Sequence, residues 1–280
     1  SGYSSTMVNV GELTNKGVEL LLTGAPIRTE NFGWNVSFNM SYNKSEVVSL
    51  VDPENDEERF NIGLSRARHA WVTHIEGKPF GQITGSVFLR DANGDLALDA
   101  NGLPQVDEEA GTVAFGTGVH PFNAGLQNSF RYKDLTLSFL LDMRDGAVGH
   151  SGTNAQLYRR GVHKNTLIGR ENGLGVIPAS DIREYYEKIY NDIAEEFIYD
   201  AGFVKLREIT LGYNVPSDLL SKTFISKANV SFVARNLWLI HSKVDNIDPE
   251  SSYNASNAQG LDFFAMPQTT SFGFNVNLTF

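Results

Sequence analysis

The carboxy-terminal stretch 271–280 reads SFGFNVNLTF, in which every even-numbered residue is apolar and every odd-numbered residue is small or polar. Successive side chains of a β-strand point to opposite faces, so this pattern predicts a strand with one apolar face and one polar face. Half-buried strands of soluble sheets alternate in the same way. What favours a membrane sheet is how often the pattern recurs upstream, and over what length.

The same alternation recurs in several further stretches of the chain. It is clean at 34–42, where large apolar residues alternate with asparagine and serine. The alternation changes phase between Leu206 and Ile209, which predicts a β-bulge near residues 207–208. The other predicted strands cover residues 17–25, 122–132, 135–144, 203–213 and 230–240.

Short and long connections alternate between these strands. Long excursions are predicted at 45–121, 146–200 and 241–268, and shorter turns at 28–31, 133–134 and 216–227. Outer-membrane barrels combine short periplasmic turns with long extracellular loops, and their apolar band is roughly 25 Å tall, which a tilted ten-residue strand spans. The sequence therefore predicts an all-β fold, a transmembrane antiparallel up-and-down β-barrel segment of about seven strands.

The predicted excursions contain a few local structures of their own. A helix is predicted over 181–197, because Asp181 and Glu184 fit a capping box and an apolar stripe follows. This helix is interpreted as a packed loop element. The first excursion is predicted to be one long loop with a small hairpin at its Asn93-Gly94 turn. Residues 1–16 are predicted to be an irregular lead-in, and Pro26 is predicted to end the first strand.

Composition excludes several classes of function. The net charge of −10 disfavours nucleic acid as a partner, and the lack of cysteine excludes a disulfide framework. No apolar run is long enough for a transmembrane helix. No nucleophile elbow, phosphate-binding loop or dinucleotide motif occurs, so the protein is not expected to be an enzyme. Seven strands do not close an even-numbered barrel, so we expect a fragment or one chain of a split barrel.

Short motifs that occur in order along the chain carry a family resemblance. They include NVGELTNKGVE at 9–19, DANGD at 91–95, FVKLREITLGY at 203–213, ARNLW at 234–238, DPE at 248–250 and NLTF at 277–280. Together they resemble SusC/RagA-type TonB-dependent transporters, and the matches run through nearly the whole chain.

The resemblance implies that residues 1–280 are the carboxy-terminal segment of a barrel of about 22 strands, a size class with a plugged lumen. It implies import of oligosaccharides or oligopeptides across the outer membrane of a Gram-negative bacterium. The implied partners are the rest of the barrel and its plug domain, a SusD-like surface lipoprotein, the TonB complex, outer-membrane lipid and the barrel-assembly machinery. The family's plug and TonB box are amino-terminal, so this chain is not expected to transport alone.

Four residues match the ligand spacing of a calcium-binding loop. Asp91, Asn93, Asp95 and Asp99 take positions 1, 3, 5 and 9 of that spacing. Leu96 stands where the loop needs glycine, and Gly102 where it needs a bidentate glutamate. The alternative interpretation is an Asn-Gly hairpin with solvated acidic residues, and calcium is the only cofactor that the sequence suggests.

Aromatic residues supply the remaining candidate sites. Those in predicted loops could stack on sugar rings or contact peptide side chains, or could pack the loops and anchor a lipoprotein; they are Trp71, Tyr158, Tyr253, Phe263 and Phe264. Those near strand ends are expected to form interfacial girdles; they are Trp34, Tyr42, Tyr132, Tyr213 and Trp238. The terminal Phe280 is expected to be the signal for barrel assembly. Two alternatives stay open, a non-transporting adhesin or structural barrel and a soluble glycan-binding β-sandwich.

The alternation predicts that Phe274 faces lipid and Asn275 faces the lumen. Phe274→Arg should cost on the order of 2–4 kcal/mol of folding free energy because the charge would enter hydrocarbon, whereas Asn275→Arg should cost far less. Refolding of both variants in detergent or lipid measures the difference. Equal tolerance of arginine at the two positions would reject a membrane-embedded strand.

Overall fold

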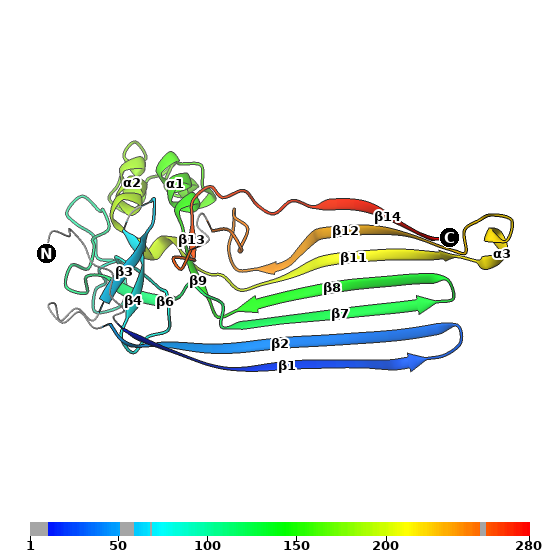
Figure 1. Ribbon diagram of the computed structural model, residues 1–280. Coiled ribbons are helices and arrows are strands. Elements are labelled where there is room, and N and C mark those ends of the chain that lie inside the picture. The colour runs from blue at the N-terminus through cyan, green and yellow to red at the C-terminus, as the bar shows by residue number, and fades with distance from the viewer. Residues whose placement is uncertain (1–10, 51–58, 68, 253–255) are drawn as a thin grey trace, which may run out of the picture.

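The computed structural model describes residues 11–50, 59–67, 69–252 and 256–280. Its main element is an antiparallel seven-stranded sheet in the order β1-β2-β7-β8-β11-β12-β14 (Figure 1). The strands are β1 (Glu12–Arg28), β2 (Phe32–Ser49), β7 (Phe122–Tyr132), β8 (Leu135–Asp145), β11 (Phe203–Val215), β12 (Lys227–Ser242) and β14 (Ser271–Thr279). Each strand pairs with the neighbour that precedes or follows it among these seven, which confirms the predicted up-and-down barrel wall.

Short and long connections lie at opposite ends of the sheet. The turns between β1 and β2 and between β7 and β8 lie at one end, together with the short helix α3 (Ser217–Leu220) and the carboxy terminus (Figure 1). The small strands and the longer helices gather at the other end. This segregation is the one predicted from the alternation of short and long connections.

Strand register gives the sheet one apolar and one polar face. Residues directly opposite each other in an antiparallel pair point to the same face. One apolar row crosses the sheet through Phe274, Phe232, Leu211, Leu137, Phe130 and Trp34. The adjacent row is small or polar and runs through Asn275, Ser231, Gly212, Thr136, Arg131 and Gly33. The two faces therefore continue from β14 to β2, across six of the seven strands.

Asn128 is the polar exception on the apolar face, and the structure gives it a partner. Its Oδ1 accepts a hydrogen bond from the indole Nε1 of Trp34 at 3.0 Å. A polar group on an apolar surface is costly unless it is hydrogen-bonded, and here one bond satisfies groups of both residues. The asparagine thus interrupts the sequence pattern without interrupting the strand.

The predicted boundaries of the first strand are wrong. β1 begins at Glu12, inside the expected lead-in, and continues past Pro26 to Arg28. Pro26 lies where the register shifts between Gly24 and Ile27. Proline lacks the N–H that a ladder needs, and a local irregularity in the pairing accommodates it. Residues 1–10 are outside the described part of the chain.

The predicted β-bulge in the fifth long strand is confirmed. The pairing of β11 with both β8 and β12 shifts between Leu206 and Glu208. Arg207 is the extra residue relative to β8, whereas on the β12 side the register skips Asn236 and Leu237. A bulge adds one residue to one strand and turns its neighbours relative to the regular pattern. Arg207 and Glu208 are consecutive, yet both bond to groups on the polar face, Asp142 and Arg235.

The first excursion has more structure than the single hairpin predicted for it. A four-stranded sheet forms from β3 (Arg59–Leu64), β4 (Ala70–Ile75), β5 (Gln82–Gly85) and β6 (Val113–Thr117). A second small sheet joins β9 (Val148–Ser151), β10 (Ile198–Asp200) and β13 (Leu261–Asp262). These strands are two to six residues long, and those of the second sheet pair over long sequence distances, so periodicity within one segment gives little sign of them. The acidic stretch 51–58 is outside the described residues.

The second excursion holds two α-helices packed into one core. The predicted helix is α2 (Ile182–Asp192), and the expected stripe is buried, with Ile193 and Phe197 contributing from beyond its end. Its capping box is wrong, because Asp181 makes no side-chain bond to the helix. Helix α1 (Gly152–Arg160) was not predicted. Short 3₁₀ turns follow the helices at η1 (Lys164–Leu167) and η2 (Glu195–Phe197).

The ends of α1 were nevertheless visible in the sequence. Ser151 caps its first turn by accepting a hydrogen bond from the Asn154 N–H at 3.0 Å. Gly161 ends it with φ of 65°, the left-handed conformation typical of a residue after a helix. Among the described residues, no helix combines the length and the apolar character needed to cross a membrane.

Candidate functional site at the loop end of the sheet

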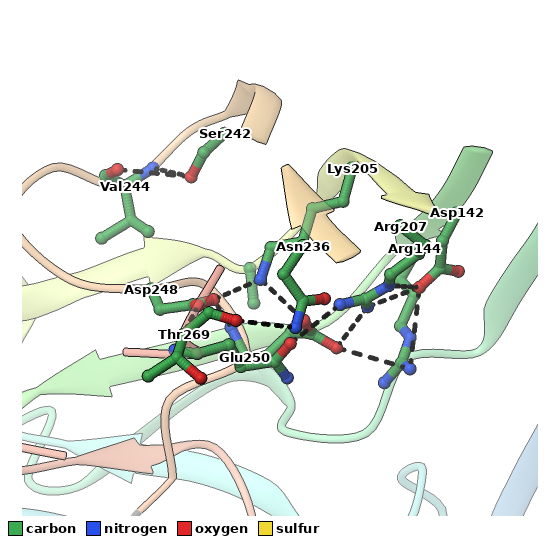
Figure 2. A network of polar contacts seen from close by, with 12 residues as sticks. Asp142, Arg144, Lys205, Arg207, Asn236, Ser242, Val244, Asp248, Glu250 and Thr269 are labelled. Atoms are coloured by element: carbon green, nitrogen blue, oxygen red, sulfur yellow. Dashed lines mark hydrogen bonds and ion pairs between the residues drawn. The ribbon is translucent and has the colours of Figure 1, made fainter. Parts of the chain in front are cut away.

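A cluster of six charged side chains lies where β8 and β11 meet the connection between β12 and β14. We call it the charge cluster, and its members are Asp142, Arg144, Lys205, Arg207, Asp248 and Glu250 (Figure 2). Four of them come from the strands and two from the connecting loop. The cluster therefore joins the loop to the wall of the sheet.

The bulge in β11 delivers two cations to this place. Lys205 lies opposite Asp142 in the register, and the extra residue Arg207 reaches the same carboxylate. The Nε and a terminal nitrogen of Arg207 both donate to Asp142 Oδ2, at 2.7 and 2.5 Å. The same terminal nitrogen also donates to Glu250 Oε1 at 2.6 Å. One guanidinium thus links β8 to the loop, using the planar fork that suits carboxylates.

Glu250 is the centre of the charge cluster. Lys205 Nζ donates to Glu250 Oε2 and to Asp248 Oδ1, both at 2.6 Å. A guanidinium nitrogen of Arg144 lies 3.4 Å from Glu250 Oε1. The side chains of Lys205 and Glu250 are only 7% and 10% exposed. Such burial is tolerable because three cations face three anions and their hydrogen bonds are satisfied.

The ion pairs determine the charge state of Glu250. Burial alone would raise the pKa of its carboxyl group, but hydrogen bonds from Arg207 and Lys205 outweigh burial and lower that pKa to about 2. The carboxylate is therefore ionised at every physiological pH. Phe203, which is 2% exposed, packs beneath the cations, with Lys205 Nζ 5.1 Å from its ring centroid. Ring faces attract cations, so Phe203 adds to the stability of the cluster.

Two concave surfaces adjoin the charge cluster. A hollow of about 1000 Å³ lies over the polar face of the sheet, and Asn39, Asn123, Asp142, Arg207 and Arg235 are among its lining residues. A groove of about 700 Å³ lies between the loop end of β12 and residues 264–268. Lys205 and Asp248 line this groove, whereas Arg144 and Arg207 line the hollow. The cluster therefore stands between the two surfaces.

The structure disperses the aromatic residues suggested as cargo contacts. Tyr158 is 4% exposed and donates to Glu196 at 2.5 Å, so it packs the loop core as its alternative interpretation states. Trp71 is half-buried in β4. Phe263 packs against Arg66 and Phe264, and Phe264 is 57% exposed and lines the groove. Tyr253 lies outside the described residues. The structure thus leaves Phe264 as the candidate exposed at a concave surface.

The residues with calcium-loop spacing form two consecutive turns. Asp91 Oδ1 accepts hydrogen bonds from the N–H groups of Asn93 and Asp95, at 2.8 and 3.0 Å. Asp99 repeats the arrangement with Asn101 and Leu103, at 2.8 and 2.9 Å. Within the described ranges, no three carboxylate or histidine groups are placed to hold a metal ion. Turn formation accounts for these aspartates, and a calcium site stays a prediction.

Comparisons with known proteins agree with this architecture. No family model matches the chain. TonB-dependent receptor P3 of Formosa agariphila is 26% identical over an alignment that covers 100% of this chain and 30% of the receptor. TonB-dependent receptor SusC of Bacteroides thetaiotaomicron is 23% identical, over 97% of this chain and 27% of SusC. The chain thus spans less than a third of the length of these relatives.

The fold is also similar to a solved transporter structure. The structure of the RagAB peptide transporter superposes with a TM-score of 0.67 at 18% identity, over 100% of this chain and 31% of that chain. The long sheet with opposed apolar and polar faces defines the chain as part of an outer-membrane-type β-barrel wall. More particularly, the chain resembles SusC/RagA-type TonB-dependent receptors over its whole length, which confirms the family resemblance seen in the sequence motifs.

The charge cluster predicts a strong effect of neutralising its centre. Glu250→Gln keeps the shape of the side chain but leaves Lys205 and Arg207 without a shared anion. Losing one partner of a buried pair costs about 3–5 kcal/mol, so hydrogen exchange of residues 243–252 should accelerate strongly. The pH dependence follows from the lowered pKa: the stabilisation is complete at neutral pH and is lost as pH falls from the usual carboxyl range toward about 2.

Asp245→Asn provides the matched control. Asp245 lies in the same loop as Glu250 and pairs with Lys164, but both side chains of this pair are exposed. Its exchange should stay close to that of the unmodified protein. Similar exchange in the Glu250 and Asp245 variants would contradict a special role for the buried cluster.

Proposed function

We propose that this chain forms the carboxy-terminal barrel wall of an outer-membrane, TonB-dependent transporter that imports oligosaccharides or oligopeptides. The observation that supports this most directly is the continuous seven-stranded sheet with one apolar and one polar face. The apolar face suits lipid, and the polar face suits a water-containing lumen with a plug. The relatives are receptors rather than enzymes, which supports a function without catalysis.

The proposal requires further strands and partners. In the described structure β1 and β14 each pair on one side only, and an unpaired edge is not tolerated in hydrocarbon. The remainder of the barrel and its plug domain are the proposed neighbours of these edges. By analogy with the family, a SusD-like lipoprotein would cover the loop end, and the TonB complex would supply energy through the plug.

Cargo uptake in living cells tests the proposed function. A strain lacking the full-length gene should lose uptake of its cargo, and the intact gene should restore it. Fluorescent oligosaccharides and oligopeptides supplied separately would identify the cargo class, and a protonophore should abolish uptake because TonB action requires energy. Restoration of cell adhesion without any uptake would instead favour the adhesin interpretation.

The terminal Phe280 is proposed to be the signal read by the assembly machinery. Its side chain is 74% exposed, and its ring stacks on that of Phe224 with centroids 5.6 Å apart. Deleting Phe280 from the full-length protein should change refolded stability little, because an exposed side chain buries little area. Abundance in the outer membrane should fall sharply, because a last strand must be held until its open edge finds a partner.

Phe224→Ala is the control for this deletion, because it removes the stacking partner and leaves the carboxy terminus intact. Membrane abundance of this variant should be close to normal. Normal abundance of the Phe280 deletion would reject the signal, and so would an equally large defect in refolding in vitro.

A further inference from the structure

The groove beside the charge cluster has the properties of a ligand site. It lies between Asn236 and Trp238 of β12 on one side and the rim segment 264–268 on the other, at the loop end of the sheet. A hydrogen bond joins the rim to the charge cluster: the Gln268 N–H donates to Asp248 Oδ2 at 3.3 Å. A ligand in the groove would therefore contact a wall that the ion pairs have already fixed.

Three residues that line the groove have a left-handed backbone conformation. Asn236, Asn246 and Phe264 all line it, and their φ angles are 50°, 68° and 51°. Asparagine adopts left-handed backbone readily, but this conformation is costly for a large aromatic, and residues strained in this way concentrate at binding sites. The N–H of Phe264 is held by Thr153 Oγ1 at 2.7 Å. Phe264 is thus held in an exposed position by a strained backbone conformation.

Phe264 is oriented as a platform rather than as a core residue. Its ring meets that of Phe263 edge to face, with centroids 5.1 Å apart and an interplanar angle of 87°. This contact supports the ring while more than half of the residue stays exposed. An exposed aromatic face held rigidly at the side of a groove is suited to stacking on a flat apolar surface of a ligand.

Three amide side chains extend the groove with groups that can form hydrogen bonds. Asn236 Nδ2 donates to Thr269 O at 3.2 Å (Figure 2), and Asn246 Nδ2 donates to Asn154 Oδ1 at 3.0 Å. Gln268 Oε1 accepts from Arg207 at 3.1 Å. In the described part of the chain, each amide is anchored by one end. The other ends, two acceptors and one donor, stay available to a ligand.

Among the described residues, each charged side chain that lines the groove has an oppositely charged partner. Lys205 and Asp248 line it but pair with each other at 2.6 Å. Asp245 also lines it and pairs with Lys164. A charged ligand would find no free counterion here, so the site favours a neutral polar molecule.

We propose that this groove is a subsite for a neutral sugar residue, in which Phe264 stacks on the ring and Asn236, Asn246 and Gln268 bond its hydroxyl groups. Each sugar hydroxyl both donates and accepts, which matches the mixed free ends of the amides. A peptide backbone is less well matched at the rim, because the N–H groups of Phe264 and Gln268 are already bonded and Pro267 has none. The inference rests on the proposed import function and assigns oligosaccharides, rather than oligopeptides, as the cargo.

Binding measurements on the purified full-length protein test the subsite. Short neutral oligosaccharides and short neutral peptides are titrated in parallel, with calorimetry as the readout. Oligosaccharide binding is expected, and Phe264→Ala should weaken it by about three- to tenfold, the loss expected for one aromatic contact. Phe264→Trp should retain the affinity because it keeps a stacking face.

Met266→Ala is the matched control, since Met266 lies on the same rim and is 92% exposed but offers no ring. Its affinity should change less than twofold. The inference is overturned if the protein binds only peptides, if it binds neither class, or if Phe264→Ala leaves oligosaccharide affinity unchanged. Failure of the proposed function is a separate result, namely that deletion of the gene leaves uptake of both cargo classes intact.

Discussion

Complete pairing of backbone N–H and C=O groups is the constraint on which this structure depends. A sheet in hydrocarbon has no water to satisfy an unpaired strand, so each long strand must run beside another over the full height of the apolar band. Two-residue alternation then follows along each regular stretch, because the pairing fixes which side chains share a face. The row from Phe274 to Trp34 records this constraint across six of the seven strands.

The charge cluster shows how a loop is attached to such a wall. A regular strand offers a loop only alternate side chains, but the bulge at Arg207 adds one more donor near the loop end of β11. Arg207 and Lys205 then bind Glu250 of the loop. Buried ion pairs are a weak source of net stability, since desolvation offsets much of the attraction. Their value here lies in selecting one arrangement of loop and wall, because any other arrangement leaves buried charges unpaired.

Much of the sheet and little of the loop region could be predicted from the sequence. Alternation at 34–42 and 271–280 and the phase change near Arg207 depend on local pattern, and the structure confirms the strands and the bulge there. The continuation of β1 past Pro26 was missed, because the register irregularity that accommodates a proline within a strand depends on the pairing with β2. The four-stranded loop sheet was missed for another reason: its strands are four to six residues long, too short for a two-residue periodicity to stand out.

The site could be predicted only in part, because its residues come from segments that lie far apart in the sequence. The motifs FVKLREITLGY and DPE were recognisable one by one, yet nothing within either stretch states that Lys205 would meet Asp248 and Glu250. Which loop aromatic is exposed could not be predicted from the sequence either, because Tyr158 and Phe264 are both loop aromatics and differ only in the packing around them. Burial of Tyr158 follows the hydrophobic effect and needs no further cause. Exposure of Phe264 opposes that effect and adds a left-handed backbone, and the proposed ligand stacked on the ring would compensate for both.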